Sequence, residues 1–383
     1  MPIAWADVTD PPSPVGTEPA GGPAADQSAS AGPTRPSRRK QVIAGLVTLV
    51  VLVIVFFGIF PKFANYGEAW ESIQEMSASS LALFALATVA NILIYVFPYQ
   101  AALPGLAYGR AFIVRQTSFM ISNAVPAGGA FGLGVQYAML NGYGIDPAVS
   151  TSAIGVTSVW NLMVTLALPA LGLLALVLSD EATSGALLGA VLSLVALGVM
   201  VGGLALILRS EGWARRLGGW GDALLARLRP RSAPAAGEDG PLTAGALRFR
   251  DQTVDVVHDR WIRLTVTNFG QQLSQFAVLA VAVYGLGGKS TGINLLELFA
   301  AFSLARLAGF IPITPGGLGT VDAALVGLMS AFGMDKDQAL AANLLWRAAT
   351  FIPQVVIGIV TFLIWRVQQN KRLGRAAAAA PSA

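Results

Sequence analysis

Cysteine is absent from this 383-residue chain, and histidine occurs only once, at His258. Without thiols the chain can form no disulfide bond, no thiolate metal site and no cysteine nucleophile. No histidine–carboxylate cluster has the spacing of a metal site, and because His258 falls in a predicted polar cytoplasmic loop, no Ser–His–Asp set could assemble around it. A phosphate loop for nucleotides is also missing, because Val283 stands where Gly287-Gly288-Lys289-Ser290 would need its first glycine. We therefore predict a protein that is not an enzyme, does not hydrolyse ATP and binds no metal or cofactor.

Charged residues are scarce as well, at 12% of the chain against 54% hydrophobic residues. This is about half of the charged share of a typical soluble domain, so we expect lipid to cover the exterior. The basic residues that give the net charge of +4 gather beside apolar runs, as at Arg35–Lys40. That pattern is typical of a cytoplasmic membrane face and does not indicate nucleic acid as a partner. We predict a multi-pass protein of the bacterial cell (inner) membrane.

The order of polar and apolar stretches predicts the domain organisation. Residues 1–40 are rich in proline and glycine, and we expect a disordered cytoplasmic tail there. The uncharged run Gln41–Phe60 is predicted as a first span, and residues 367–383 as a second cytoplasmic tail. Further runs that could cross roughly 30 Å of hydrocarbon are Ser80–Leu103, Val149–Leu178, Ser184–Leu208, Trp261–Leu286 and Ala339–Trp365.

The predicted cytoplasmic loop 209–260 has a helical pattern of its own. Its apolar residues at helical spacing are Trp213, Leu217, Trp220, Leu224 and Leu228. We predict an amphipathic helix that lies on the inner leaflet. Because Gly218, Gly219 and Gly221 weaken a helix, a solvated linker is the alternative.

One sequence element occurs twice. The chain reads PAGGAFGLGVQYAMLNGYGID from Pro126 to Asp146, and 189 residues later it reads PGGLGTVDAALVGLMSAFGMD from Pro315 to Asp335. In both copies a proline opens a glycine-rich bend, a glycine follows 18 residues later and an aspartate 20 residues later. Duplicated broken elements in apolar sequence are typical of transporter binding sites.

The charges at the ends of the apolar runs predict how these two elements cross the membrane. Basic stretches, including Tyr108–Arg115, are expected in the cytoplasm, and Asp180-Glu181 outside. Segments 110–145 and 294–334 must then each return to the side from which they start, and they enter from opposite faces. Their arms of 15 residues would span only about 22 Å as helices. We therefore predict re-entrant hairpins, with two tilted crossings as the alternative.

The predicted fold is an all-α polytopic membrane protein with about six spanning helices and two re-entrant hairpins, with both termini inside. Its halves, 41–178 and 184–366, would form an inverted repeat. The bends cannot expose free backbone groups to lipid, so they would line a wet cavity and offer helix N-termini to an anion. Close helix packing is the other explanation for the glycines. The predicted bend residues are Pro126, Gly128, Gly129, Pro315, Gly316, Gly317 and Gly319.

Polar residues form stripes on the predicted spans. Asn343 shares a helix face with Arg347, and Asn161 lies on the equivalent face of the first half. The stripe in Trp261–Leu286 consists of Asn268, Gln271, Gln272 and Gln275. Such stripes either line a hydrated path or form hydrogen bonds that join helices. We predict that these residues bind a substrate.

Three charged residues fall inside the predicted membrane region, namely Arg306, Asp322 and Arg347. Each such charge costs about 2.5–3.5 kcal/mol or more, so these side chains should face the interior and have partners. One reading is an Arg306–Asp322 ion pair that closes the second hairpin. The other is that both arginines hold a lipid phosphate while Asp322 positions Arg306 or carries a proton.

The segment Pro315-Gly316-Gly317-Leu318-Gly319-Thr320-Val321-Asp322 resembles the P-G-G-L-G-x-x-E pattern of the lysylphosphatidylglycerol synthase transmembrane-domain family. The resemblance covers about residues 40–370 and includes Gly333 beyond the motif. It implies a polytopic inner-membrane protein and, for relatives that carry a synthase domain, a flippase for aminoacylated phospholipid. Asp322 replaces the usual glutamate, and no synthase domain follows Arg375, so the stand-alone form is the nearer match.

The residues and the resemblance together predict a flippase-like transporter that moves a phospholipid or a lipid-linked headgroup between leaflets. Membrane lipids would be its partners. One alternative is a non-transporting scaffold that recruits a cell-envelope synthase or glycosyltransferase, and another is a secondary transporter for a small solute. The lipid, the direction of transport, the coupling ion and the oligomeric state are not predicted.

Overall fold

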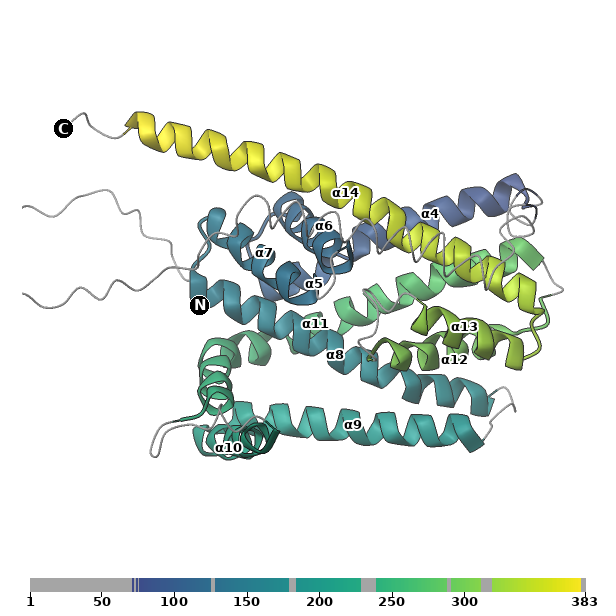
Figure 1. Cartoon of the computed structure of the whole chain (residues 1–383), viewed down its shortest axis with the longest axis horizontal. Coiled ribbons are helices and arrows are strands. Elements are labelled where there is room, and N and C mark those ends of the chain that lie inside the picture. Colours follow the sequence, from purple (N-terminus) through teal and green to yellow (C-terminus); the bar gives the residue numbers. More distant parts are fainter. Residues whose placement is uncertain are drawn as a thin grey trace, which may run out of the picture. The chain divides into compact units, whose positions relative to one another are not determined.

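The structure is a computed structural model that describes residues 71, 74, 76–124, 128–178, 184–228, 239–287, 291–310 and 319–379. Every regular element in these ranges is a helix (Figure 1). The predicted tail 1–40, the first span Gln41–Phe60 and four bend residues (Pro126, Pro315, Gly316 and Gly317) lie outside the described residues.

The predicted span Ser80–Leu103 is observed as two helices, α4 (Ala78–Ile94) and α5 (Phe97–Ala102). Ser77 caps α4, because its Oγ accepts a hydrogen bond from the backbone N–H of Ser80 at 3.2 Å. The break falls just before Pro98, in the first turn of α5, where proline's missing N–H costs no helical hydrogen bond.

The other predicted apolar runs are helical too. Together with α4–α5, three of them give four segments that are long and apolar enough to cross a membrane: Ala78–Ala102, Pro147–Leu176, Val256–Leu286 and Lys336–Asn370. The prediction of an all-α membrane protein is confirmed. The remaining helices are α6 (Tyr108–Ala124), α7 (Gly128–Gly142), α8 (Pro147–Leu178), α9 (Ser184–Arg209), α10 (Glu211–Leu228), α11 (Pro241–Gly287), α12 (Leu295–Ala305), the 3₁₀ helix η3 (Arg306–Phe310), α13 (Thr320–Ala331) and α14 (Lys336–Ala379).

Helices extend through both segments that the sequence predicts to lie in the cytoplasm, and the helix predicted at Trp213–Leu228 is confirmed as α10. In the predicted loop 209–260, residues 211–228 form α10, and residues 241–260 are the first part of the 47-residue helix α11. In the predicted tail 367–383, α14 continues to Ala379. Polar residues within a helix do not extend its apolar run. Hydropathy alone therefore marks where the apolar part of a helix ends, and not where the helix itself ends.

Buried side chains gather around two helix pairs. One cluster surrounds α12 and α13 and includes Phe302, Met329 and Trp346. Another surrounds α6 and α7 and includes Met139 and Leu264. Helix α11 contributes to both clusters, so it links the two halves.

Large apolar side chains are also exposed along the apolar helices. Examples are Leu86 at 64%, Val199 at 71% and Val356 at 55% of their full accessibility. A soluble protein rarely exposes so many apolar residues on successive helix turns, whereas lipid solvates them at no cost. This surface fits the scarcity of charged residues in the sequence.

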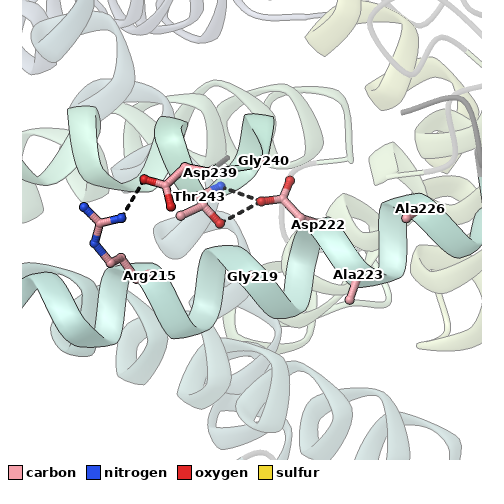
Figure 2. A pocket seen from close by; sticks show the side chains of 8 residues that line it. All are labelled: Arg215, Gly219, Asp222, Ala223, Ala226, Asp239, Gly240 and Thr243. Carbon is pink, nitrogen blue, oxygen red and sulfur yellow. Dashed lines mark hydrogen bonds and ion pairs between the residues drawn. The ribbon is translucent and has the colours of Figure 1, made fainter. Parts of the chain in front are cut away.

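The junction between α10 and α11 is fixed by Asp222 (Figure 2). Its carboxylate accepts hydrogen bonds from the backbone N–H groups of Leu242 and Thr243, at 2.9 and 3.0 Å, and from the Thr243 hydroxyl at 2.7 Å. These are free N–H groups in the first turn of α11, so Asp222 caps α11 from a neighbouring helix. Gly218 lies against the Thr243 backbone and leaves no room for a Cβ. Gly218 lowers the helix propensity of α10, but only a glycine fits at this contact with α11.

The pKa of Asp222 predicts how this junction depends on pH. Burial raises its pKa, but the three hydrogen bonds lower it by more, so the pKa of Asp222 lies below its ordinary value. Its stabilising effect is therefore complete above the unfolded-state pKa of about 3.9 and is lost as the pH falls through the lower, folded-state pKa. Amide hydrogen exchange in the first turn of α11 should be protected at pH 6 and lose protection in acid.

At pH 6, Asp222→Ala should lower this protection by roughly five- to tenfold, the size expected for a lost helix cap. The control is Asp251→Ala, because Asp251 is an exposed carboxylate on α11, the helix whose exchange is measured. Equal effects of the two substitutions would contradict the capping role.

Candidate functional site

The two copies of the repeated element end in the same turn. Gly144 and Gly333 have positive φ angles of 84° and 99°, which glycine adopts without strain. The next N–H closes a six-residue loop in each copy, from Ile145 to the Leu140 carbonyl at 3.2 Å and from Met334 to the Met329 carbonyl at 3.1 Å. The repeated glycine therefore terminates the second arm of each hairpin.

The repeated aspartate starts the long helix that follows. Asp146 Oδ1 accepts a hydrogen bond from the N–H of Ala148 at 2.7 Å, and Asp335 Oδ1 accepts one from Asp337 at 2.9 Å. Both are N-caps, of α8 and α14 respectively. The spacing that drew attention to these residues thus reflects a duplicated turn and cap, and no ligand-binding role is needed to explain it.

Helices α6 and α7 form an antiparallel pair, here named hairpin 1. Ser118 on α6 donates to the Gly132 carbonyl at 3.2 Å and accepts from Gln136 of α7. Nearer the bend, Gly128 lies against the carbonyl groups of Ile121 and Ser122. The predicted bend residues Gly128 and Gly129 are therefore the first residues of α7, and close packing explains Gly128.

Helices α12, η3 and α13 form the second pair, here named hairpin 2. Its two ends meet, because a Cβ on Gly333 would lie 3.0 Å from the Gly292 carbonyl oxygen. At the bend, the predicted residue Gly319 has a φ of 91° and immediately precedes α13. Both hairpins therefore start and end on one side of their own bends.

Contacts along α14 show that the hairpins point toward each other. The open end of hairpin 1 lies at the C-terminal side, where Tyr143 contacts Gln368, and α6 then runs back along α14 through Thr117–Thr361 and Phe119–Phe351. The open end of hairpin 2 lies beside the start of α14, and near its bend Asp322 binds Arg347. Figure 1 shows hairpin 1 beside the C-terminal part of α14 and hairpin 2 beside its N-terminal part.

Helices α8 and α14 each contact both hairpins. Helix α8 begins beside hairpin 1 and packs on α12 of hairpin 2, where Gly172 lies against Ala300 and Ser303. Helix α14 begins beside hairpin 2 and packs on α6 of hairpin 1, where Gly358 lies against Met120 and the Gln116 carbonyl. Each long helix therefore spans from its own hairpin to the opposite one.

The acidic residue of hairpin 2 pairs with α14. Asp322 Oδ1 lies 2.5 Å from Arg347 Nε, and the side chains are only 8% and 12% exposed. The other carboxylate oxygen accepts the N–H of Gly319 at 2.7 Å, at the N-terminus of α13. Asp322 thus pairs with Arg347 and not with Arg306, which the sequence had suggested as its partner.

Arg306 instead binds the carboxamide stripe of α11. Its Nη2 donates to Gln272 Oε1 at 2.5 Å and to Gln275 Oε1 at 2.8 Å, and its guanidinium lies over the Phe302 ring. Its Nε is buried without a hydrogen-bond partner among the described residues. Arg306 is therefore a buried cation that neutral groups solvate and no described carboxylate neutralises.

A cavity of about 270 Å³ lies between hairpin 1 and helices α5, α8 and α11. Arg115 of α6 lines it, and its guanidinium lies 4.5 Å from the centre of the Tyr95 ring and 5.8 Å from that of Tyr99. No described carboxylate forms an ion pair with Arg115. The other polar residues that line the cavity are Tyr99, Ser122, Gln136, Thr157, Ser158, Asn161, Asn268 and Gln271.

One hydrogen bond connects this cavity with Arg306. Gln272 Nε2 donates to Asn161 Oδ1 at 3.4 Å, so a single carboxamide lies between the cavity wall and the Arg306 guanidinium. The structure therefore brings most of the predicted site residues into one polar layer. Asn343 is separate: it is fully buried, and neither of its side-chain polar atoms has a partner among the described residues.

Comparison with known proteins identifies the family. The lysylphosphatidylglycerol synthase TM region matches residues 41–358, which include both hairpins. The chain belongs to this family. The match is to the membrane region of these proteins and not to a catalytic domain.

Curated relatives are described only as UPF0104 membrane proteins. One from Methanothermobacter thermautotrophicus is 27% identical over 160 residues, which are 41% of this chain and 43% of the relative. One from Methanocaldococcus jannaschii is 29% identical over 83 residues, 22% of this chain and 25% of the relative. A second relative from that organism is 35% identical over 83 residues, which are 21% of this chain and 35% of the relative. The matched stretches thus cover less than half of each relative.

Arg115 was not singled out in the sequence analysis, which placed it in the cytoplasmic stretch Tyr108–Arg115. In this member of the lysylphosphatidylglycerol synthase TM region family, it lies two turns inside α6. A sequence signal existed, since Arg115, Ser118 and Ser122 are spaced along one face of a helix that Tyr95 and Tyr99 could meet.

The observed ion pair predicts a specific energetic coupling. Asp322→Asn or Arg347→Gln alone should destabilise the protein by about 3 kcal/mol, because each leaves a buried charge without its partner. The double variant should be less destabilised than the sum of the two. Unfolding in mixed micelles measures these values. The matched control pairs Asp322→Asn with Arg306→Gln, for which we expect a clearly smaller coupling. A coupling that is larger for Arg306 would contradict the observed pairing.

Proposed function

We propose that this protein moves anionic lipid headgroups between membrane leaflets through the polar layer between its two hairpins. The lipid's acyl chains would remain in the bilayer while the headgroup crosses. The family membership and the apolar spans support a membrane role, and the charges of the polar layer support an anionic substrate.

The observation on which the proposal rests is an excess of positive charge. Arg115, Arg306 and Arg347 lie in or beside the polar layer, whereas Asp322 is the carboxylate that binds one of them. Two guanidinium groups thus have no described carboxylate partner in a part of the protein where an uncompensated charge is costly. A phosphate diester would supply the missing negative charge, and guanidinium geometry suits phosphate oxygens.

The hairpins supply a further reason for anion binding. Gly129, at the N-terminus of α7, lines the cavity together with Arg115. The first N–H groups of a helix are free and carry partial positive charge, so this end of α7 favours an anion beside the arginine. If hairpins 1 and 2 enter from opposite membrane faces, this site and Arg306 would be reached from different leaflets.

The carboxamides provide a path between the two arginines. Gln272 and Gln275 solvate Arg306, and Asn161 connects Gln272 to the cavity wall with Asn268 and Gln271. Neutral carboxamides can exchange hydrogen bonds with a passing headgroup without holding it as a fixed charge would. The movement would be downhill or ion-coupled, since the sequence contains no nucleotide-binding motif.

Translocation of fluorescent phosphatidylglycerol in proteoliposomes tests this proposal. Arg115→Gln and Arg306→Gln should each slow translocation by about 10- to 100-fold, because each removes a charge-assisted hydrogen bond worth about 1.5–3 kcal/mol. The matched control is Arg248→Gln, since Arg248 is an exposed arginine of α11 that donates to the Ala244 carbonyl.

Two results would contradict the proposal. One is a wild-type protein that moves no labelled lipid in vesicles of anionic composition. The other is a rate that falls equally for Arg248→Gln and the two cavity variants, since a general loss of folded protein would then explain the effect.

A further inference from the structure

Helix α10 has one side packed on α11 and one side without a partner among the described residues. Ala214, Gly218 and Asp222 recur every four residues and are buried against the start of α11. On the other side, Trp220 and Leu224 are exposed at 69% and 59% of their full accessibility. This unpartnered apolar face lies on a helix whose packing against α11 is fixed by Asp222.

The exposed residues belong to a continuous surface. Trp213 and Leu217 are half-buried seven residues, or two turns, before Trp220 and Leu224. Leu242 of α11 lies beside Gly221 with 46% exposure. We name this set the α10 apolar surface; its members are Trp213, Leu217, Trp220, Leu224 and Leu242. Its composition, with two tryptophans among leucines, is typical of residues at a membrane–water boundary.

Basic residues border this surface. Arg216 and Arg227 are exposed on α10, and Arg216 lies over the Trp213 ring with 5.5 Å between guanidinium carbon and ring centre. Arg215 differs, because it is neutralised by Glu211 and Asp239 on the side of α10 that faces the α11 N-terminus (Figure 2). The arginines beside the apolar surface are thus the ones without a described carboxylate partner.

Helix α10 lies next to the ends of apolar helix segments. The apolar helix α9 ends at Arg209, one residue before α10 begins. Leu204, near that end, packs in the same cluster as Phe249 and Val257 of α11, and the span-like part of α11 starts at Val256. Helix α10 therefore follows directly from the end of an apolar helix that packs near the start of the span-like part of α11.

We propose that the α10 apolar surface lies in the interface of the inner leaflet and binds anionic lipid, with Arg216 and Arg227 contacting the headgroups. The apolar side chains would enter the acyl boundary, while the arginines remain at the level of the phosphates. Because arginines border the apolar residues, this surface matches an anionic lipid surface in both charge and polarity. This inference depends on the membrane placement of α9 and α11 and not on lipid transport.

The absence of cysteine allows a clean test, because a single introduced thiol is the only label site. Trp220→Cys and Leu224→Cys carry a nitroxide label on the proposed membrane side. The matched controls are Ala223→Cys and Ala226→Cys, since Ala223 and Ala226 line the pocket around Asp222 (Figure 2). The full-length protein is reconstituted in vesicles of phosphatidylcholine with phosphatidylglycerol, and collisions with oxygen and with an aqueous nickel chelate are measured.

Labels at positions 220 and 224 should collide preferentially with oxygen, and labels at 223 and 226 with the nickel chelate. If all four labels collide preferentially with nickel, the surface faces water or awaits a protein partner, and the proposal is overturned.

The arginines are tested by changing the lipid. The labels at 220 and 224 should lie deeper with phosphatidylglycerol than in pure phosphatidylcholine, and Arg216→Gln with Arg227→Gln should abolish this difference. Arg248→Gln should preserve it. A lipid dependence that survives the double substitution would show that these arginines do not contact anionic headgroups.

Discussion

An arginine placed inside a membrane protein must find an anion or enough polar groups to replace water, and this requirement organises the polar layer described above. The chain meets it in three ways. Arg347 has the carboxylate of Asp322, Arg306 has two carboxamide oxygens, and Arg115 has the faces of two tyrosine rings beside a cavity. The positive charge of Arg347 is therefore balanced within the protein. The other two leave charge that an anionic ligand can neutralise.

The duplicated turn explains how these arginines come to the same layer. A glycine in the left-handed region ends each hairpin, and an aspartate two residues later starts the next long helix. Helices α8 and α14 then reach from their own hairpin to the opposite one, so each long helix packs against both hairpins.

The sequence was sufficient for the helices and for most members of the polar layer. Apolar run lengths located α4, α8 and α9, and the helical stripe Asn268–Gln275 correctly indicated a polar face of α11. These features follow from local periodicity, which does not depend on how the helices pack.

The partners of the buried arginines could not be predicted from local periodicity. Arg306 and Arg347 are both within reach of Asp322 along the sequence, but η3 changes the helical register at Arg306 and directs it to Gln272 and Gln275. Arg115 was missed because a basic residue at the start of an apolar segment is normally a membrane boundary marker. Only the packing of α6 against α4 and α5 shows that it is internal.

The central claim is that the two hairpins open toward opposite sides of the membrane. Ala148 and Asp337 occupy equivalent exposed positions at the start of α8 and α14, 189 residues apart. Single variants Ala148→Cys and Asp337→Cys can be treated in intact cells with a membrane-impermeant maleimide. The account predicts labelling of the thiol at 337 from outside and labelling of the thiol at 148 only after permeabilisation. Reaction of both thiols from the same side would contradict it.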